Sequence, residues 1–454
     1  MMEHTDVLVI GGSAAGLVSA LAAKSHYPNK DVMLIRKEEK AVIPCGIPYI
    51  FGTLNSAEED ILPDAGLIKA GVEIRINEVM TINGKEKKCQ LKDYSEIAFD
   101  KLILATGSTP MIPDWLKGVH LQHVYTVPKD LKYLDLMSEQ LSSLKDIVVI
   151  GAGFIGIEMS DELKKKGKNV TLIEIMPHIL GKAFDADLAD EAESILLERG
   201  VNILKGHGVK EIIGEAKVEG VKIEYDDVVN IVKADAVILA MGYEPNTELA
   251  KNINVAFNRD GFIKVDEYMR TDIPDIFAVG DCAEKRDFFT RKRTNAMLAS
   301  IACAEARVAG MNLYKLSTLK TISGTIAIFS TALNGTGFGA AGLTETVAKK
   351  EGFDVITGIF KGIDRHPGVL NGSHKQIVKL IAGRENGMIL GGEVMGGSST
   401  GELINIIGLV IQNKMNVNTL LTSQIGTHPM LTASPAAYPL IKAAEKVAEK
   451  FWHN

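Results

Sequence analysis

The residue of this chain whose chemistry stands out is Cys45, in the stretch Ile43–Ile50, which reads IPCGIPYI. Flanking Pro44 and Gly46 predict a turn followed by a helix start. A helix start or a nearby positive charge lowers the pKa of a thiol, and the thiolate is the reactive nucleophile. The other cysteines lie far away in the sequence, at 89, 282 and 303, and no CxxC spacing occurs.

An unpaired cysteine limits the reactions that are possible at this position. A single thiolate cannot store two electrons as an intrachain disulfide, so its oxidised form must be a mixed disulfide, a persulfide or a sulfenic acid. The first two forms indicate a sulfur substrate, and the third indicates peroxide or oxygen. The remaining cysteines are interpreted as small buried hydrophobic residues.

A glycine-rich turn, GAGFIG, follows the apolar run at 147–150 and precedes a helical pattern. Gly151, Gly153 and Gly156 have the spacing that binds a dinucleotide pyrophosphate at a helix N-terminus. About twenty positions later Glu174 ends the next strand, where a carboxylate accepts hydrogen bonds from a ribose 2′-OH and repels a 2′-phosphate. This unit predicts an NADH site, with NADPH less favoured.

A similar unit begins near the N-terminus with GGSAAG, in which Gly11 and Gly16 hold the outer positions and Ser13 replaces the middle glycine. Serine is small enough to allow a phosphate close to the backbone. Arg36 occupies the position of the ribose-binding acid, so either Glu38 or Glu39 reaches back, or Arg36 itself contacts an adenosine.

These two units need separate domains, and the chain of 454 residues is long enough for two or three. After about residue 324 the pattern changes to alternating strands, followed by an amphipathic helix near 401–414. A net charge of −7 without a basic aromatic stripe disfavours nucleic acid. No apolar run is long enough for a membrane span, and no signal peptide is expected, which predicts a cytoplasmic protein. No metal site is predicted.

The order of the motifs GGSAAG, LILATGSTP, GAGFIGIE, MGYEPNTEL and DIFAVGDCA resembles that of the FAD-dependent pyridine nucleotide–disulfide oxidoreductases. The resemblance covers residues 7–283, and the remainder is similar, more loosely, to the dimerisation domain of that family. It implies an α/β fold with two Rossmann-like domains, for FAD and NAD, and a C-terminal α+β dimerisation domain. The expected ranges are 1–115 with 250–322 for FAD, 116–249 for NAD and 323–454 for dimerisation.

The resemblance also implies the roles of particular residues. The FAD site would include Gly11, Ser13, Ala14, Ala15, Gly16, Arg36, Lys37, Thr106, Gly107, Gly280 and Asp281. The NADH site would include Gly151, Gly153, Phe154, Ile155, Gly156, Glu158, Glu174 and Gly242. Asp281 would bind the ribityl chain of FAD and Phe154 would be an aromatic gate over the flavin. Glu158 would position the nicotinamide carboxamide.

The absence of a C-x-x-x-x-C pair makes the chain similar to the single-cysteine branch of the family, with Cys45 as the redox residue. That branch contains coenzyme A disulfide reductases, persulfide or polysulfide reductases, NADH oxidases and NADH peroxidases. Its oxidases and peroxidases typically carry histidine in the first glycine turn, where this chain has Ala14. The first helix offers only Lys24 as a basic group for coenzyme A, which favours a smaller persulfide or polysulfide substrate.

Members of the family form homodimers in which the partner's C-terminal domain completes the active site. In the segment 426–439, GTHPMLTASPAAYP, both His428 and Tyr438 are candidates to protonate the leaving sulfur. His428 lacks an orienting glutamate, because Ala433 occupies that position. The sequence therefore predicts an NADH-dependent reductase of sulfur–sulfur bonds, with an NADH oxidase or a redox-responsive binding protein as alternatives.

Overall fold

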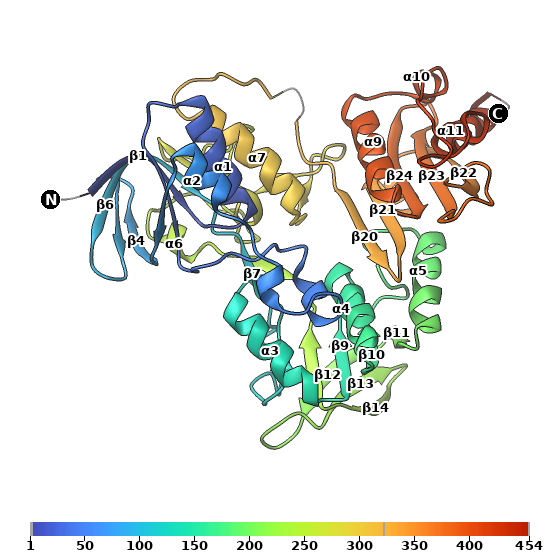
Figure 1. Ribbon diagram of the computed structural model, residues 1–454, viewed down its shortest axis with the longest axis horizontal. Helices are drawn as coiled ribbons and strands as arrows, with labels where there is room; N and C mark the ends of the chain where they lie inside the picture. Colours follow the sequence, from blue (N-terminus) through green and yellow to red (C-terminus); the bar gives the residue numbers. More distant parts are fainter. Residues whose placement is uncertain (1–2, 321–322, 453–454) are drawn as a thin grey trace.

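The structure is a computed structural model that describes residues 3–320 and 323–452. Figure 1 shows three lobes, and the first, at the upper left, contains both the N-terminal segment and the later helix α7 (Ala299–Met311). The second lobe lies below, and the third, at the upper right, ends with the C-terminus. The chain therefore returns to its first lobe before it enters the third.

The first lobe is built on a mainly parallel sheet with the strand order β3-β2-β1-β6-β5-β4, and β17 also pairs with β6. Val7, Leu8 and Val9 of the central strand are fully buried, as expected for a parallel strand covered on both faces. Helices α1 and α7 pack side by side on this sheet (Figure 1). The elements are β1 (Glu3–Ile10), α1 (Ala14–His26), β2 (Val32–Arg36), α2 (Ala65–Ala70), β3 (Glu73–Ile76), β4 (Val79–Asn83), β5 (Lys88–Leu91), β6 (Glu96–Leu104), β17 (Ile276–Ala278) and α7.

The second lobe repeats the strand–helix–strand unit in a five-stranded parallel sheet with the order β11-β10-β9-β15-β8. A short antiparallel pair, β7 (Ser108–Pro110) with β16 (Tyr243–Pro245), lies where the chain enters and leaves this lobe. A separate three-stranded antiparallel sheet, β12-β13-β14, adjoins it. The elements are β8 (Val124–Tyr125), α3 (Leu131–Ser143), β9 (Asp146–Ile150), α4 (Phe154–Lys165), β10 (Asn169–Glu174), α5 (Ala186–Glu198), β11 (Asn202–Lys205), β12 (Gly208–Ile213), β13 (Gly220–Tyr225), β14 (Val228–Lys233) and β15 (Ala236–Leu239). Helix α6 (Glu248–Lys251), which follows β16, packs on β4 of the first lobe (Figure 1).

The third lobe is a five-stranded antiparallel sheet, in the order β20-β21-β24-β23-β22, with helices packed on it. The predicted amphipathic helix is α9 (Thr400–Gln412), whose Leu403, Ile407 and Ile411 are buried. The other elements are β20 (Ile328–Leu333), β21 (Thr336–Gly342), α8 (Glu345–Lys350), β22 (Val355–Ile363), β23 (Lys375–Gly383), β24 (Ile389–Gly396), α10 (Val417–Leu421) and α11 (Pro439–Trp452). The predicted fold class, two Rossmann-like domains and an α+β domain, is confirmed.

A buried ion-pair cluster joins the second lobe to the third. Lys379 of β23 lies 2.9 Å from Asp185 at the start of α5, and 3.1 Å from Asp187. Glu393 of β24 accepts a hydrogen bond from the Asp185 backbone N–H at 2.6 Å. The carboxyl groups of Asp185, Asp187 and Glu393 lie within 4.8 Å of one another, and the ammonium group of Lys379 also lies 3.5 Å from Glu393. This cluster is therefore an interdomain ion-pair network.

None of the helices in the described ranges is both long enough and apolar enough to cross a lipid bilayer.

Candidate active site

The first glycine turn has the close backbone contacts that a phosphate-binding turn requires. A Cβ atom on Gly16 would lie 1.8 Å from the carbonyl oxygen of Gly11, and one on Gly11 would lie 2.1 Å from that of Ala105. Gly11 also has a φ of +116°, a conformation that L side chains rarely adopt. Ser13 is the N-cap of α1, so the free N–H groups of Ala14 and Ala15 lie at the helix end that attracts a phosphate.

A cleft of about 870 Å³ extends from this turn along the carboxyl ends of β1 and β2 and across to the second lobe. The edge of a parallel sheet at its carboxyl ends is where dinucleotides bind. The predicted residues that line the cleft are Gly11, Ser13, Arg36, Lys37, Thr106 and Gly107. The narrow glycine turn, the helix N-terminus and the long cleft together fit the pyrophosphate and adenosine of FAD.

Arg36 has a structural role that the sequence left open. Its guanidinium donates two hydrogen bonds of 2.6 Å to Asp64, and others to the carbonyl oxygens of Glu38 and Glu39. The residue is only 3% exposed, and its aliphatic stem lies against Gly12. Arg36 therefore shapes the wall of the cleft, while four hydrogen bonds hold its guanidinium to protein acceptors. Glu38 lines the cleft at the adenosine end.

Asp281 lies on a short 3₁₀ turn that follows β17, close to Thr106 and Gly107 at the end of β6. Its carboxylate accepts hydrogen bonds from Ser108 Oγ at 2.7 Å and from Lys129 Nζ at 3.0 Å. Burial opposes the charged form, but Lys129 and Ser108 hold the pKa of Asp281 below its ordinary value. The structure thus brings together the predicted FAD residues Thr106, Gly107 and Asp281.

Lys129 was not predicted. It follows β8, a two-residue strand, and its ammonium group enters the same cleft as Thr106 and Gly107. It has no motif around it, so only its position in space reveals a role. Ser108, in contrast, lies within the predicted motif LILATGSTP. Both residues extend the polar lining of this cleft.

The second glycine turn has the same construction as the first. A Cβ atom on Gly156 would lie 1.8 Å from the carbonyl oxygen of Gly151, which itself has a φ of +100°. Gly153 is the N-cap of α4, and Gly242 follows β15 at the neighbouring strand end with a φ of +115°. The geometry fits a second pyrophosphate at the N-terminus of α4.

Glu174 ends β10 with its carboxylate turned toward this glycine turn. Its Oε2 accepts the N–H of Ala152 at 2.7 Å and its Oε1 accepts that of Met176 at 2.8 Å. These two bonds fix the carboxylate, and each oxygen keeps a lone pair. The predicted position beside the ribose of NADH is therefore compatible with the structure.

Phe154 and Glu158, at the start of α4, both contact the third lobe. The ring of Phe154 packs edge-to-face on Phe329 of β20, with the ring centroids 4.8 Å apart. Glu158 accepts a hydrogen bond of 2.6 Å from the hydroxyl of Thr331, and burial raises its pKa to about 7. Ile155 packs beside them against the main hydrophobic core. The predicted nicotinamide-site residues therefore lie at a junction between two lobes.

Cys45 lies before the 3₁₀ helix Ile47–Phe51, which packs on α4. The thiol is exposed, but burial of its surroundings and the Glu158 carboxylate raise its pKa, and Lys129 lowers it. The sequence predicted a lowered pKa for the Cys45 thiol, and this prediction is wrong. A single-turn helix supplies little dipole, and more carboxylates than cations lie around the thiol.

The C-terminal candidates lie in the third lobe. His428 is exposed, and its Nδ1 accepts the backbone N–H of Met430 at 3.2 Å. Tyr438 is half-buried against the core of this lobe, and burial raises its pKa. His366, which the sequence analysis missed, lies beside them, with Nδ1 3.1 Å from the carbonyl oxygen of Thr432. No motif marked it.

The class of protein follows from three features: two dinucleotide-binding domains, a thiol next to the helix that carries the second glycine turn, and a third α+β lobe. Together they are typical of a flavoprotein oxidoreductase that binds two dinucleotides. Comparison with known proteins agrees. The family described as pyridine nucleotide-disulphide oxidoreductase matches residues 5–306, and its dimerisation domain matches residues 328–437. The chain belongs to this family, whose members use FAD and a pyridine nucleotide.

Individual relatives cover almost the whole chain. An NADH oxidase of Methanocaldococcus jannaschii is 30% identical, with 98% of each chain aligned. A NAD(P)H coenzyme A polysulfide/persulfide reductase of Pyrococcus horikoshii is 32% identical over 86% of this chain and 87% of its own. The solved structure of an NAD-dependent persulfide reductase from A. fulgidus superimposes with a TM-score of 0.88 at 26% identity, covering 98% of this chain and 83% of that one.

Proposed function

We propose that this protein is an FAD-containing, NADH-dependent reductase of persulfides or polysulfides, with coenzyme A disulfide as a further possible sulfur substrate. The observation that carries the proposal is that Cys45 is exposed and has no cysteine partner. All four cysteines lie in the described ranges and all are free, with Cys89 and Cys282 buried and Cys303 half-buried. The second sulfur must therefore arrive with the substrate. The names of the P. horikoshii and A. fulgidus relatives support this assignment.

The chemistry at Cys45 follows from thiol–disulfide exchange. The Cys45 thiolate attacks the outer sulfur of a persulfide RSSH, which forms a Cys45–S–SH group, breaks the S–S bond of the substrate and expels RS⁻. The expelled RS⁻ takes up a proton to become the thiol RSH. Two electrons and a proton then break that S–S bond, which regenerates the thiolate and releases hydrogen sulfide. Bound FAD supplies the acceptor for the hydride of NADH and the donor of that electron pair. The net reaction converts NADH, a proton and RSSH into NAD⁺, RSH and H₂S.

We further propose a homodimer in which the partner's third lobe completes this site. His428 Nδ1 accepts a backbone N–H, which leaves Nε2 as the ring nitrogen that can face a substrate. To donate a proton to a leaving sulfur, His428 must first take up a proton as the imidazolium, which ends the Nδ1 contact. Tyr438, whose pKa burial raises, retains its proton at neutral pH. Either group in the partner's lobe could act as the general acid.

The ligand preferences follow from two contacts. Glu174 is fixed beside the second glycine turn, so its negative charge favours the 2′-OH of NADH over the 2′-phosphate of NADPH. Lys24, the basic group of the first helix, donates to the carbonyl oxygens of Pro28 and Lys30 and so does not extend toward a coenzyme A phosphate. A small persulfide or polysulfide is therefore favoured. Four free cysteines also support a reducing compartment, the cytoplasm.

A second candidate function is the reduction of oxygen by NADH. The observation that favours it is the name of the M. jannaschii relative, an NADH oxidase that aligns along 98% of this chain. Ala14, at the start of α1, has no proton to exchange with an oxygen substrate, which favours the sulfur reaction.

Anaerobic NADH oxidation by the FAD-loaded protein separates the two functions. We expect turnover with polysulfide or a persulfide, and its loss in Cys45→Ser. Cys303→Ser is the matched control, because it removes a half-buried thiol from α7. Full activity of Cys45→Ser with these substrates would exclude the thiolate mechanism. NADH oxidation that requires oxygen would instead establish the oxidase.

A further inference from the structure

Asp60 is a buried carboxyl group directly beneath the loop that carries Cys45. The loop is closed by two backbone hydrogen bonds, from Ile43 N–H to the Asp60 carbonyl oxygen and from Leu62 N–H to that of Ala41. Asp60 is 3% exposed. Its Oδ1 lies only 1.8 Å from where a Cβ atom on Gly46 would be, so the carboxyl group packs on the backbone next to Cys45.

Within the part of the chain that the structure describes, the Asp60 carboxyl group belongs to no ion pair or hydrogen-bond network that could explain its burial. Its Oδ2 is buried without a hydrogen-bond partner among the described residues. A buried polar atom without a partner costs stability, so its presence in a native protein needs an explanation. Its exposed neighbours on the same segment differ, because Glu58 is paired with Lys40 and Glu59 accepts hydrogen bonds from Asn55.

We propose that Asp60 controls the ionisation of Cys45: the thiol holds its proton more tightly when Asp60 is charged and releases it more readily when Asp60 is neutral. The inference takes from the proposed function only that Cys45 is the reactive thiol. Asp60 acts on the Cys45 thiol through the electrostatic potential of its carboxylate. It is therefore a positioning residue and does not contact the sulfur substrate.

The electrostatics around the loop support this role. The charges that influence Cys45 besides Asp60 are those of Glu158 on α4, Lys129 after β8 and Asp281 on the 3₁₀ turn. Tyr49 of the 3₁₀ helix also lies near, with a pKa that burial raises to about 12. Asp135 of α3 contacts the same segment at Ala57, whose backbone N–H it accepts.

Asp60 also changes its charge at a pH close to neutral. Burial raises the pKa of the Asp60 carboxyl to about 6. Asp60 is therefore mostly charged at neutral pH and mostly neutral below pH 6, and its negative charge opposes ionisation of the Cys45 thiol. As the pH falls toward 6, protonation of Asp60 lowers the free-energy cost of ionising the Cys45 thiol.

The test is the rate of alkylation of Cys45 by iodoacetamide in the FAD-loaded protein between pH 5 and pH 9, followed by mass spectrometry. Because the thiolate is the species that reacts, the rate reports its population. We expect Asp60→Asn to react at the wild-type rate below about pH 5. The ratio of the two rates should rise with a midpoint near pH 6 and level off at about threefold, because the charged Asp60 of the wild type lowers the thiolate fraction at Cys45.

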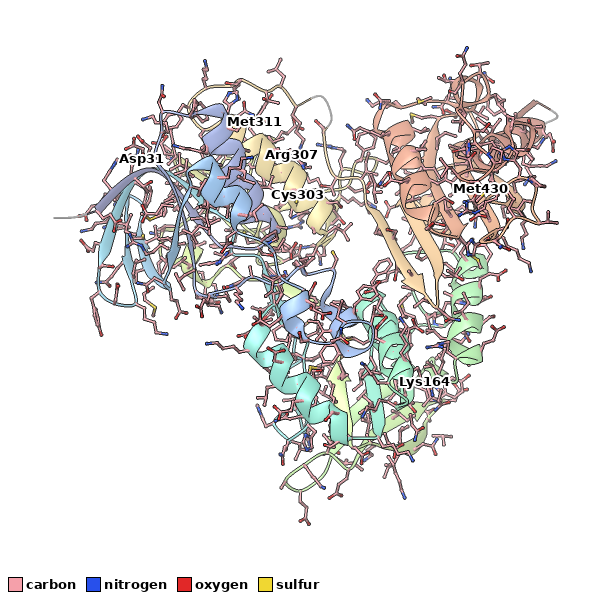
Figure 2. All side chains as sticks on the ribbon, viewed as in Figure 1. Asp31, Lys164, Cys303, Arg307, Met311 and Met430 are labelled. Carbon is pink, nitrogen blue, oxygen red and sulfur yellow. The ribbon has the colours of Figure 1, made fainter. Side chains whose placement is uncertain are left out.

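Two controls make the result specific. Glu58→Gln removes the same charge from the same segment, but at an exposed site, and should leave the ratio at one. Cys303, half-buried on α7 beside Arg307 (Figure 2), is an internal reference. At each pH its alkylation rate should be the same in the wild type and in Asp60→Asn. If Asp60→Asn does not fold, Asp60→Ser removes the charge with a smaller side chain that cannot clash with Gly46.

A ratio of one at every pH would overturn the proposal. A ratio that is raised by the same factor at every pH would also overturn it, because that result indicates altered access to the thiol without a titrating neighbour. The alkylation uses no sulfur substrate, so failure of the proposed reductase activity and failure of this inference can be told apart.

Discussion

The ion-pair cluster between the second and third lobes makes a quantitative prediction for Lys379→Met. The Lys379 side chain is 4% exposed, and its ammonium group is the cation shared by Asp185, Asp187, Glu345 and Glu393. Lys379 is buried, but these carboxylates raise its pKa, so it is charged across the physiological range. Methionine fills a similar volume, so the substitution removes the charge and leaves the packing.

The magnitude depends on what the substitution leaves behind. Removing one partner of a buried ion pair costs about 3–5 kcal/mol, because the remaining charge stays buried. Asp185 keeps hydrogen bonds from the backbone N–H groups of Glu345 and Thr346, at 2.8 and 3.0 Å, which offset part of the loss. We therefore expect Lys379→Met to lower the free energy of unfolding by about 3 kcal/mol, at the lower end of that range.

The assay is urea unfolding of the FAD-loaded protein at pH 7, followed by circular dichroism. Asp187→Asn is the matched control, because its carboxylate is 41% exposed and its pair with Lys379 should contribute less than about 1 kcal/mol. A loss below about 1 kcal/mol in Lys379→Met, equal to that of the control, would refute the view that this buried charge holds the two lobes together.

Two further predictions concern single carboxylates. Burial raises the pKa of Glu393 from 4.5 to about 8, so the folded protein keeps that proton while the unfolded chain loses it. The wild type should therefore lose stability relative to Glu393→Gln as the pH rises from 4.5 to 8, and pH-dependent urea unfolding should show a constant stability difference between the two below pH 4.5. At the second glycine turn, Glu174→Gln should lower the kcat/KM for NADH relative to NADPH by about tenfold, since a hydrogen bond to a charged acceptor contributes about 1.5–3 kcal/mol. An unchanged ratio in steady-state assays would contradict the role of Glu174.

Much of the fold could be predicted from local patterns. The buried apolar runs at Val7–Ile10 and 147–150, each followed by a glycine turn, form the parallel strands and phosphate-binding turns that were expected. The alternating pattern after residue 324 forms the antiparallel sheet of the third lobe. Such elements are encoded by residues close in sequence, because a strand period and a glycine spacing are local properties.

The candidate site was less predictable, because its electrostatics depend on residues far apart in the chain. Lys129 meets Asp281 across more than 150 positions, at 3.0 Å, and no motif announces it. The pKa of Cys45 is raised, whereas its flanking residues predicted a lowered one, because folding buries the surroundings of the thiol and brings Glu158 near it. A sequence window contains neither contact.

By itself, the sequence determined the two nucleotide-binding units, the acid at Glu174 and the lone thiol at Cys45. Each of these follows from residue type and spacing within about thirty positions, the length of one strand–helix–strand unit. Only the tertiary structure decided that Arg36 is held by Asp64, that Lys379 joins two lobes, and that an unpaired Asp60 lies against Gly46. Burial and charge at a point in space are sums over neighbours from the whole chain, and only folding assembles those neighbours.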